Sequence, residues 1–156
     1  MSFSPKQILV PLDGSENAEQ ALTAAIDIAK ETGAHLHLIR VYLPAYMAAN
    51  IGVGLAVREF DNDLLVDFKA YLKKIMTRLD KAGVTNVEAH VVEGNVKKTI
   101  ALDYPAEHQI DLIVIGATGM DAFSQTVLGS VTDFVVNKAK VNVMVVKRSE
   151  ADASEG

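Results

Sequence analysis

Short apolar runs alternate along this chain with longer segments whose apolar residues repeat at intervals of three and four. The runs have the length and β-branched content of strands, and the longer segments have the period of amphipathic helices. Five strands are therefore predicted, over residues 8–12, 36–41, 87–92, 112–115 and 141–146. This alternation constrains the fold strongly, because parallel strands joined by helices bury both kinds of segment against one another.

Three of the runs are nearly continuous in apolarity, which favours strands covered on both faces, as in a parallel sheet flanked by helices. The run over residues 87–92 is mixed, and we expect that strand nearer a sheet edge. Strict alternation implies right-handed crossovers. We therefore predict an α/β fold: one doubly wound, Rossmann-like open sheet of five parallel strands in the order 3-2-1-4-5, with two helices on each face.

Two long helices are predicted from periodicity and end signals. The first follows Ser15, a typical N-cap residue, and stops at Gly33. The second has an apolar stripe over residues 64–79 that should be buried. Before it lies an unusually long, apolar-rich connection over residues 43–59. This connection is interpreted either as a loop or extra turn covering the core, or as a lid or partner surface.

Two shorter helices are predicted in the second half of the chain. One follows Asn95, and Pro105 is expected to kink or end it, because proline lacks an amide donor and disfavours the α conformation at Tyr104. The other opens at Ser130 and closes with two lysines, at positions 138 and 140, whose charges suit the negative end of the helix dipole.

Length and composition bound the domain count and exclude several classes of site. With 156 residues, 49% of them hydrophobic, we predict one domain over residues 1–148 and a small, acidic, disordered tail over 149–156. The net charge of −5 argues against nucleic-acid binding, which needs a basic surface. The absence of cysteine excludes disulfides, thiolate metal sites and cysteine nucleophiles.

Neither a signal peptide nor a membrane anchor is expected. The apolar run near the amino terminus meets charged residues at once, and no run reaches the roughly 18 apolar residues of a membrane span. We therefore expect a cytoplasmic protein without membrane contact.

A glycine-rich segment follows the fourth predicted strand. After DLIVI the chain reads GATGMDAFSQTVLGSVTDF, with glycines at positions 116, 119 and 129 and a serine opening the last helix. Glycines let backbone amides approach anionic oxygens, and the first amides of a helix carry the positive end of its dipole. The segment is interpreted as a phosphate cradle, with a purely structural turn as the alternative.

That glycine spacing, together with ILVPLDGSENA near the amino terminus, resembles the universal stress protein family. Further matching segments are LHLIRVY, VEGNVKKTI and VNVMVVKR, so the resemblance covers nearly the whole chain. The spacing G-x2-G-x9-G-S is similar to that of the family's ATP-binding branch. The resemblance implies a sheet like that of the adenine nucleotide α-hydrolases, with adenine near the first two strands and phosphates on the glycine loop.

Carried over by position, the resemblance also implies a set of binding residues. Pro11 and Val41 would border the adenine, the latter through backbone hydrogen bonds. Asp13 would face the ribose and phosphates, with metal binding as a further role. The phosphates would lie on Gly116, Gly119, Gly129, Ser130 and Val131, with Thr132 as a neighbour.

Two features leave alternatives open at this site. Residues 120–128 contain no lysine or arginine but include Asp121, whereas ATP-binding relatives commonly have basic residues there. Either a divalent cation such as Mg²⁺ or Mn²⁺ balances the phosphates, or the site prefers a less charged nucleotide such as AMP or ADP. Asp13 has an alternative role as a turn or helix-cap residue together with Ser15.

The histidines carry a weaker signal. His35 and His37 lie two apart on one predicted strand, a spacing seen in some metal sites, but no third ligand or carboxylate accompanies them in the sequence. They are interpreted as strand surface, and His90 and His108 are isolated.

The resemblance implies an ATP-binding protein with a regulatory or sensing role in stress response. There is no nucleophile elbow and no P-loop lysine after the glycines, so ATP hydrolysis should be slow at most. The alternatives are a weak ATP-hydrolysing enzyme of the same fold and an interaction module without ligand. The resemblance also implies a homodimer in which the last strands, residues 141–147, pair across a twofold axis and close an apolar sheet edge.

Overall fold

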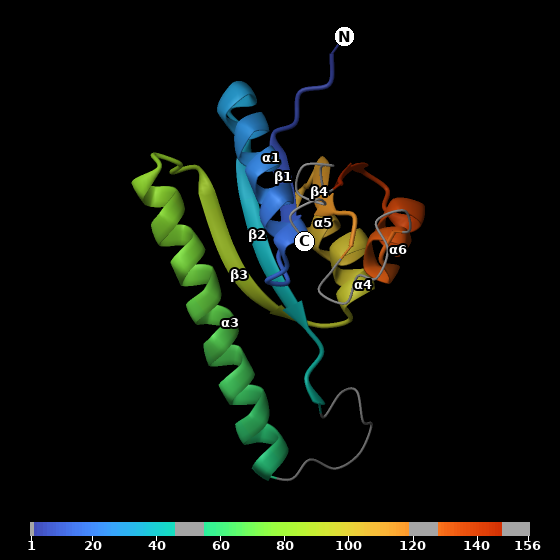
Figure 1. Ribbon diagram of the computed structural model, residues 1–156. Helices are drawn as coiled ribbons and strands as arrows, with labels where there is room; N and C mark the ends of the chain where they lie inside the picture. The colour runs from blue at the N-terminus through green and yellow to red at the C-terminus, as the bar shows by residue number, and fades with distance from the viewer. Residues whose placement is uncertain (1, 46–54, 119–127, 148–156) are drawn as a thin grey trace, which may run out of the picture.

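The computed structural model describes residues 2–45, 55–118 and 128–147, and its centre is a five-stranded sheet (Figure 1). All strand pairs are parallel, and the order is β3-β2-β1-β4-β5. The strands are β1 (Gln7–Pro11), β2 (His35–Tyr42), β3 (Val87–Glu93), β4 (Leu112–Gly116) and β5 (Asn142–Val146). The predicted fold class and strand order are therefore confirmed. The mixed run forms the edge strand β3.

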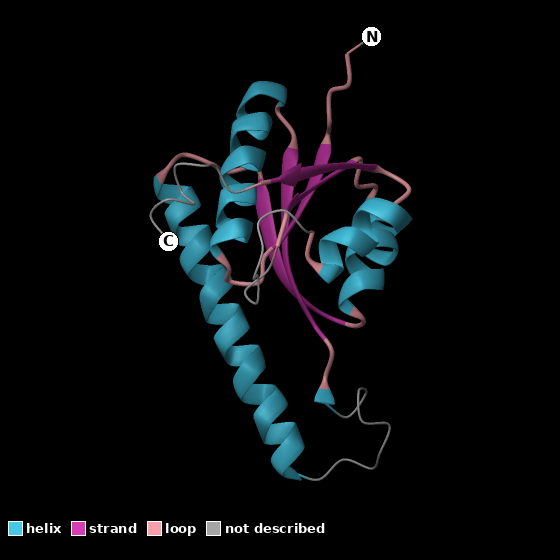
Figure 2. Cartoon of the chain, turned by 45° about the vertical axis from the view of Figure 1, so that its right-hand side comes forward, coloured by secondary structure: helices cyan, strands magenta, loops and turns pink. Residues whose placement is uncertain are grey.

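Helices cover both faces of the sheet, as Figure 2 shows. One face packs against α1 (Glu16–Thr32) and α3 (Leu55–Lys81). The other face packs against α4 (Val96–Lys98), the π-helical turn η1 (Thr99–Asp103), α5 (Tyr104–His108) and α6 (Ser130–Lys138). No helix among the described ranges is both long enough and apolar enough to cross a membrane.

The two faces hold separate halves of the core because successive strand residues point to opposite sides of a sheet. On β1, Ile8 and Val10 join the cluster under α1 and α3, whereas Leu9 joins the cluster under α5 and α6. All three side chains are fully buried, and each such burial stabilises the fold by about 1.5–3 kcal/mol. The buried central strands thus hold in place the carboxyl ends of the sheet, where the loops of the candidate site begin.

The first long helix begins and ends as predicted. Ser15 is its N-cap, and the serine Oγ accepts a hydrogen bond from the amide of Ala18 at 3.1 Å. Gly33 ends the helix in the left-handed conformation, with φ of 78°, which glycine adopts without steric cost.

The prediction that Pro105 ends the helix after Asn95 and moves Tyr104 out of the α conformation is wrong. Tyr104 keeps α-helical angles, φ −64° and ψ −46°, and its amide donates to the carbonyl of Thr99, five residues back. The wider π turn precedes the proline, which then occupies the first turn of α5. A proline is tolerated at that position because its missing amide would have no helical partner there. The chain therefore continues as a helix.

The long connection between β2 and α3 is shorter than its sequence suggests. Helix α3 already begins at Leu55, so residues 55–59 are helical. Residues 46–54 lie outside the described ranges, as does the predicted tail over residues 149–156. The second half of the predicted apolar stripe of α3 is buried, through Leu72, Ile75 and Leu79, whereas its first half, residues 64–68, is at most half-buried.

Candidate functional site

The carboxyl ends of the parallel strands all lie at the same end of the sheet (Figure 1). The ladder between β1 and β2 ends at the pair Pro11 and Ile39. Val41 therefore lies two residues beyond the last pair and remains in register only with Val92 on β3. In doubly wound folds, ligands bind at this end of the sheet, outside the carboxyl ends of the strands.

The backbone of Val41 faces the side that β1 has left. The carbonyl of Tyr42 accepts from Gly94 on the β3 side at 2.9 Å, whereas that of Ile39 accepts from Leu12 on the β1 side at 2.8 Å. Alternate residues of a strand turn their amide and carbonyl to the same neighbour. The polar backbone groups of Val41 are thus directed like those of Ile39, past the end of the β1 ladder.

Asp13 lies half-buried just after β1, at the entry to α1. Its Oδ1 accepts a hydrogen bond from the amide of Ser15 at 2.9 Å, across Gly14, whose φ is 85°. This is the turn role given above as the alternative for Asp13. The bond uses one oxygen of the carboxylate and is compatible with a ligand contact at the other.

Sequence reasoning missed Arg40, which lies beside Asp13. Its guanidinium stacks over the ring of Phe68 at 4.3 Å and donates to the carbonyl of Leu12 at 3.3 Å. Burial lowers the pKa of Arg40, while the negative charge of Asp13 acts to raise it. An arginine inside the otherwise apolar run LHLIRVY was the available signal.

Two buried polar atoms in this region have no hydrogen-bond partner among the described residues. They are Nε of Arg40 and the hydroxyl of Tyr71, which lies on α3. Burial raises the pKa of that phenol, and the carboxylates of Glu19 and Asp13 act in the same direction. Unpaired buried polar groups are rare in folded proteins, and they are expected where a ligand or water completes the bonding.

Gly116, at the end of β4, is buried against the first turn of α1. A Cβ at this position would lie 2.8 Å from the backbone oxygen of Asn17, closer than real contacts allow. The side chain of Asn17 in turn donates a short hydrogen bond to the hydroxyl of Thr118. The structure therefore gives Gly116 a packing role between strand and helix.

The start of α6 is tied to the same strand end. The hydroxyl of Thr132 donates to the carbonyl of Gly116 at 2.7 Å, and the amide of Gly129 donates to the carbonyl of Ala117 at 2.8 Å. Thr132 is buried, so its hydroxyl is committed to this structural bond. Gly116, Gly129 and Thr132 are thereby brought together.

Gly129 is the N-cap of α6 and has no side chain with which to cap it. Ser130, the first helical residue, is exposed, and Val131 is half-buried. The remaining predicted member of the loop, Gly119, lies outside the described residues together with Asp121.

The packing of Gly116 makes a stability prediction. Gly116→Ala should lower the free energy of unfolding by about 1–3 kcal/mol, because the added methyl group overlaps the rigid backbone of α1. Urea unfolding followed by circular dichroism measures this loss. An unchanged unfolding midpoint would contradict the close approach of strand and helix.

Comparison with known proteins identifies the family. The model of the universal stress protein family matches residues 5–147. The chain belongs to this family. A protein of Staphylococcus haemolyticus that carries the family's name is 34% identical over 149 residues, which cover 93% of this chain and 86% of its own length.

Solved structures agree with this assignment. The universal stress protein UspA from Lactobacillus plantarum superposes with a TM-score of 0.75 at 33% identity, covering 91% of this chain and 97% of that one. A universal stress protein solved in complex with cAMP has a TM-score of 0.61 at 26% identity, covering 94% of this chain and 100% of that one.

At the amino ends of the strands, opposite the glycine-rich end of β4, this member of the family has a cluster of histidines that are separated in the sequence. His37 is 4% exposed, so it is not strand surface, and Glu88 on β3 supplies the carboxylate that the sequence did not reveal. His35 and His90 also contact Glu88. The ring of His108 lies 5.7 Å from that of His37. The interpretation of His37 as strand surface is therefore wrong, whereas the side chain of His35 is 25% exposed.

The charges in this cluster are coupled. Burial lowers the pKa of His37, although Glu88 acts to raise it. Burial acts to raise the pKa of Glu88, but hydrogen bonds with His90 and His35 prevail and hold it below its usual range. A neutral His37 thus lies near an ionised Glu88.

Proposed function

We propose that this protein binds an adenine nucleotide, with ATP as the principal ligand, at the carboxyl ends of β1, β2 and β4. The observation that carries the proposal is the start of α6, where a glycine N-cap leaves the first-turn amides without a side-chain cap beside the end of β4. Such a helix start attracts phosphate through its free amides and its dipole. The relative solved with cAMP supports an adenine nucleotide as the ligand class.

The adenine fits the backbone at Val41. An adenine edge offers a donor at N6 beside an acceptor at N1, and the carbonyl and amide of one strand residue complement this pair. Val41 has these groups directed past the end of the β1 ladder. Pro11, the last residue of β1, would border the base.

The ribose and the phosphate charge fit the region around Asp13 and Arg40. The carboxylate of Asp13 has an oxygen outside the turn bond to Ser15, which suits a ribose hydroxyl or a nucleotide-bound Mg²⁺ or Mn²⁺ ion. Arg40 supplies positive charge near that carboxylate. Arg40 and such an ion would offset part of the phosphate charge that residues 120–128 do not balance.

A binding role without rapid turnover suits a regulatory protein. The sequence has no P-loop lysine after the glycines that could stabilise charge developing during phosphoryl transfer, so we expect ATP hydrolysis to be slow. We infer that the nucleotide state of the protein acts as the signal. Heat denaturation of purified protein, followed by mass spectrometry of the released small molecules, tests whether an adenine nucleotide is bound.

The role of Asp13 is tested by Asp13→Asn. Asparagine keeps the oxygen that accepts from Ser15 but removes the charge, so the turn should survive while nucleotide affinity falls at least about tenfold, or about 1.4 kcal/mol. Calorimetric titration of ligand-free protein with ATP and Mg²⁺ measures the change. Asp27→Asn, on the exposed face of α1, is the matched control and should bind like the parent. Equal affinity of Asp13→Asn and the parent would remove Asp13 from the site.

A further inference from the structure

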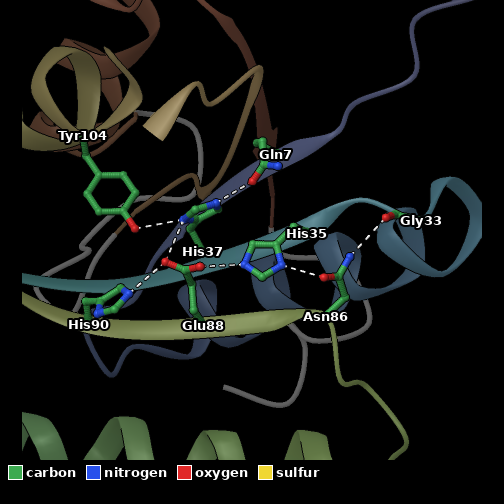
Figure 3. Close-up of polar contacts among 8 residues, drawn as sticks. All are labelled: Gln7, Gly33, His35, His37, Asn86, Glu88, His90 and Tyr104. Carbon is green, nitrogen blue, oxygen red and sulfur yellow. Dashed lines mark hydrogen bonds and ion pairs between the residues drawn. The ribbon is translucent and has the colours of Figure 1, made fainter. Parts of the chain in front are cut away.

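The histidine and carboxylate cluster lies at the amino ends of the strands, away from the nucleotide site. His35 and His37 begin β2, and Glu88 is the residue of β3 in register with His37. Figure 3 shows the carboxylate of Glu88 directed toward both imidazoles and the hydroxyl of Tyr104, on α5, directed toward His37. The ligand atoms of His35, His37 and Glu88 all lie within 4.8 Å of one another.

Hydrogen bonding fixes the ring of His35 so that Nε2 faces the carboxylate. Nδ1 of His35 lies 2.6 Å from Oδ1 of Asn86, and the amide nitrogen of Asn86 donates to the carbonyl of Gly33 at 3.2 Å. That second bond orients the asparagine, so Nδ1 of His35 carries the proton. Nε2 lies 2.7 Å from Oε2 of Glu88. With the proton of Nδ1 committed to Asn86, this close contact needs positive charge at Nε2, supplied either by a second proton, as in the hydrogen bond to Glu88 described above, or by a metal ion that replaces that proton.

The ring of His37 is held in a similar way. Its Nε2 lies 2.7 Å from Oε1 of Gln7, an acceptor, so the proton of the neutral ring belongs on Nε2. Nδ1 then presents its lone pair 3.4 Å from Oε1 of Glu88 and 2.9 Å from the hydroxyl of Tyr104. Metal-binding histidines are typically oriented by such a second hydrogen bond from the other ring nitrogen.

We propose that His35, His37 and Glu88 bind one divalent transition-metal ion, with Zn²⁺ as the best match. Two imidazoles and a carboxylate form a ligand set that zinc uses, and zinc bonds near 2.0–2.1 Å place tetrahedral ligand atoms about 3.4 Å apart. The Nδ1–Oε1 separation of 3.4 Å already has that value. The shorter contact between His35 and Glu88 would open slightly as the ion enters.

The surroundings favour metal entry and a fourth ligand. The side chains of His35 and Glu88 are 25% and 38% exposed, which gives an ion access from solvent. Water can supply the fourth ligand from the same side, and Nε2 of the exposed His90 lies 2.9 Å from Oε1 of Glu88, although it is not among the atoms grouped within 4.8 Å. A bound ion would link β2 to the edge strand β3 and so stabilise that edge.

The test uses tag-free, chelator-treated and nucleotide-free protein titrated with ZnCl₂ by calorimetry. We expect one Zn²⁺ per chain, and with Co²⁺ a visible absorption spectrum of tetrahedral nitrogen and oxygen coordination. Glu88→Gln and His35→Gln should each weaken Zn²⁺ binding at least tenfold. Both side chains are partly exposed, so the variants should fold, which circular dichroism checks.

Asp27→Asn is the matched control, because it removes an exposed carboxylate of α1 that belongs to neither site and should leave Zn²⁺ affinity unchanged. Zinc binding that is absent in the parent, unaffected by both cluster variants, or lost equally in Asp27→Asn would overturn the proposal.

Discussion

Gly129→Asp is expected to abolish nucleotide binding while leaving the unliganded protein at least as stable as the parent. An aspartate at the N-cap accepts hydrogen bonds from the first-turn amides of α6 and suits the helix dipole, which should add a few tenths of a kcal/mol. Gly129 has φ of −63°, which any residue can adopt. The same carboxylate occupies the position proposed for phosphate and repels the negatively charged phosphate. Stability and nucleotide affinity should therefore change in opposite directions.

Thermal unfolding with and without ATP and Mg²⁺ measures both effects. At about a hundredfold excess over the dissociation constant, ATP should stabilise the parent by about 2.7 kcal/mol. For a chain of this length that corresponds to a rise of about 5–10 °C in Tm. The Gly129→Asp variant should show no rise at the same ATP concentration.

Thr77→Asp is the charge-matched control, because it adds the same negative charge on the exposed surface of α3. It should keep the full ATP-dependent rise in Tm. A parent protein shown to be ligand-free whose Tm does not respond to any adenine nucleotide would contradict the proposed function. A normal rise in Gly129→Asp would instead place the phosphates away from α6.

Val143→Pro is expected to convert a homodimer into monomers. We propose, as the family resemblance implies, that β5 strands pair across a twofold axis, since β5 lies at the sheet edge with Met144 41% exposed. The carbonyl of Val146 accepts from Ala117, the residue after β4, so alternation turns the amide of Val143 to the free edge. Proline there removes an outward donor while sparing the ladder to β4.

Light scattering coupled to size-exclusion chromatography gives the mass of each variant. The parent should have twice the chain mass, and Val143→Pro should have the chain mass or aggregate. Val143→Ala, which keeps the amide, is the matched control and should remain dimeric. A dimer that persists in Val143→Pro would locate the interface on another surface.

Much of the fold follows from local sequence pattern. The runs of apolar residues identified all five strands, and Ser15 and Gly33 marked both ends of α1, because capping and periodicity depend on neighbouring residues. Pro105 shows the limit of such local rules. A π turn upstream, which no residue type specifies, accommodates the proline and keeps Tyr104 helical.

The two candidate sites differ in how far sequence could find them. The glycine and serine pattern indicated a phosphate-binding loop because its residues are neighbours along the chain. A second constraint requires glycine at position 116, because its backbone lies against Asn17. Asn17 is about a hundred positions away in the chain, so the spacing of neighbouring residues could not reveal this contact. Arg40 and Tyr71 likewise became candidates only when their unpaired polar atoms were seen beside Asp13.

By itself the sequence determined the alternation of strands and helices, the parallel sheet and the glycine-rich end of β4, since each depends on short-range periodicity and residue type. Only the tertiary structure decided that His37 meets Glu88, because the register of β2 with β3 joins residues that are distant in the chain. Strand register is set by burial over whole strands. A metal site built across two strands is therefore visible in the folded protein alone.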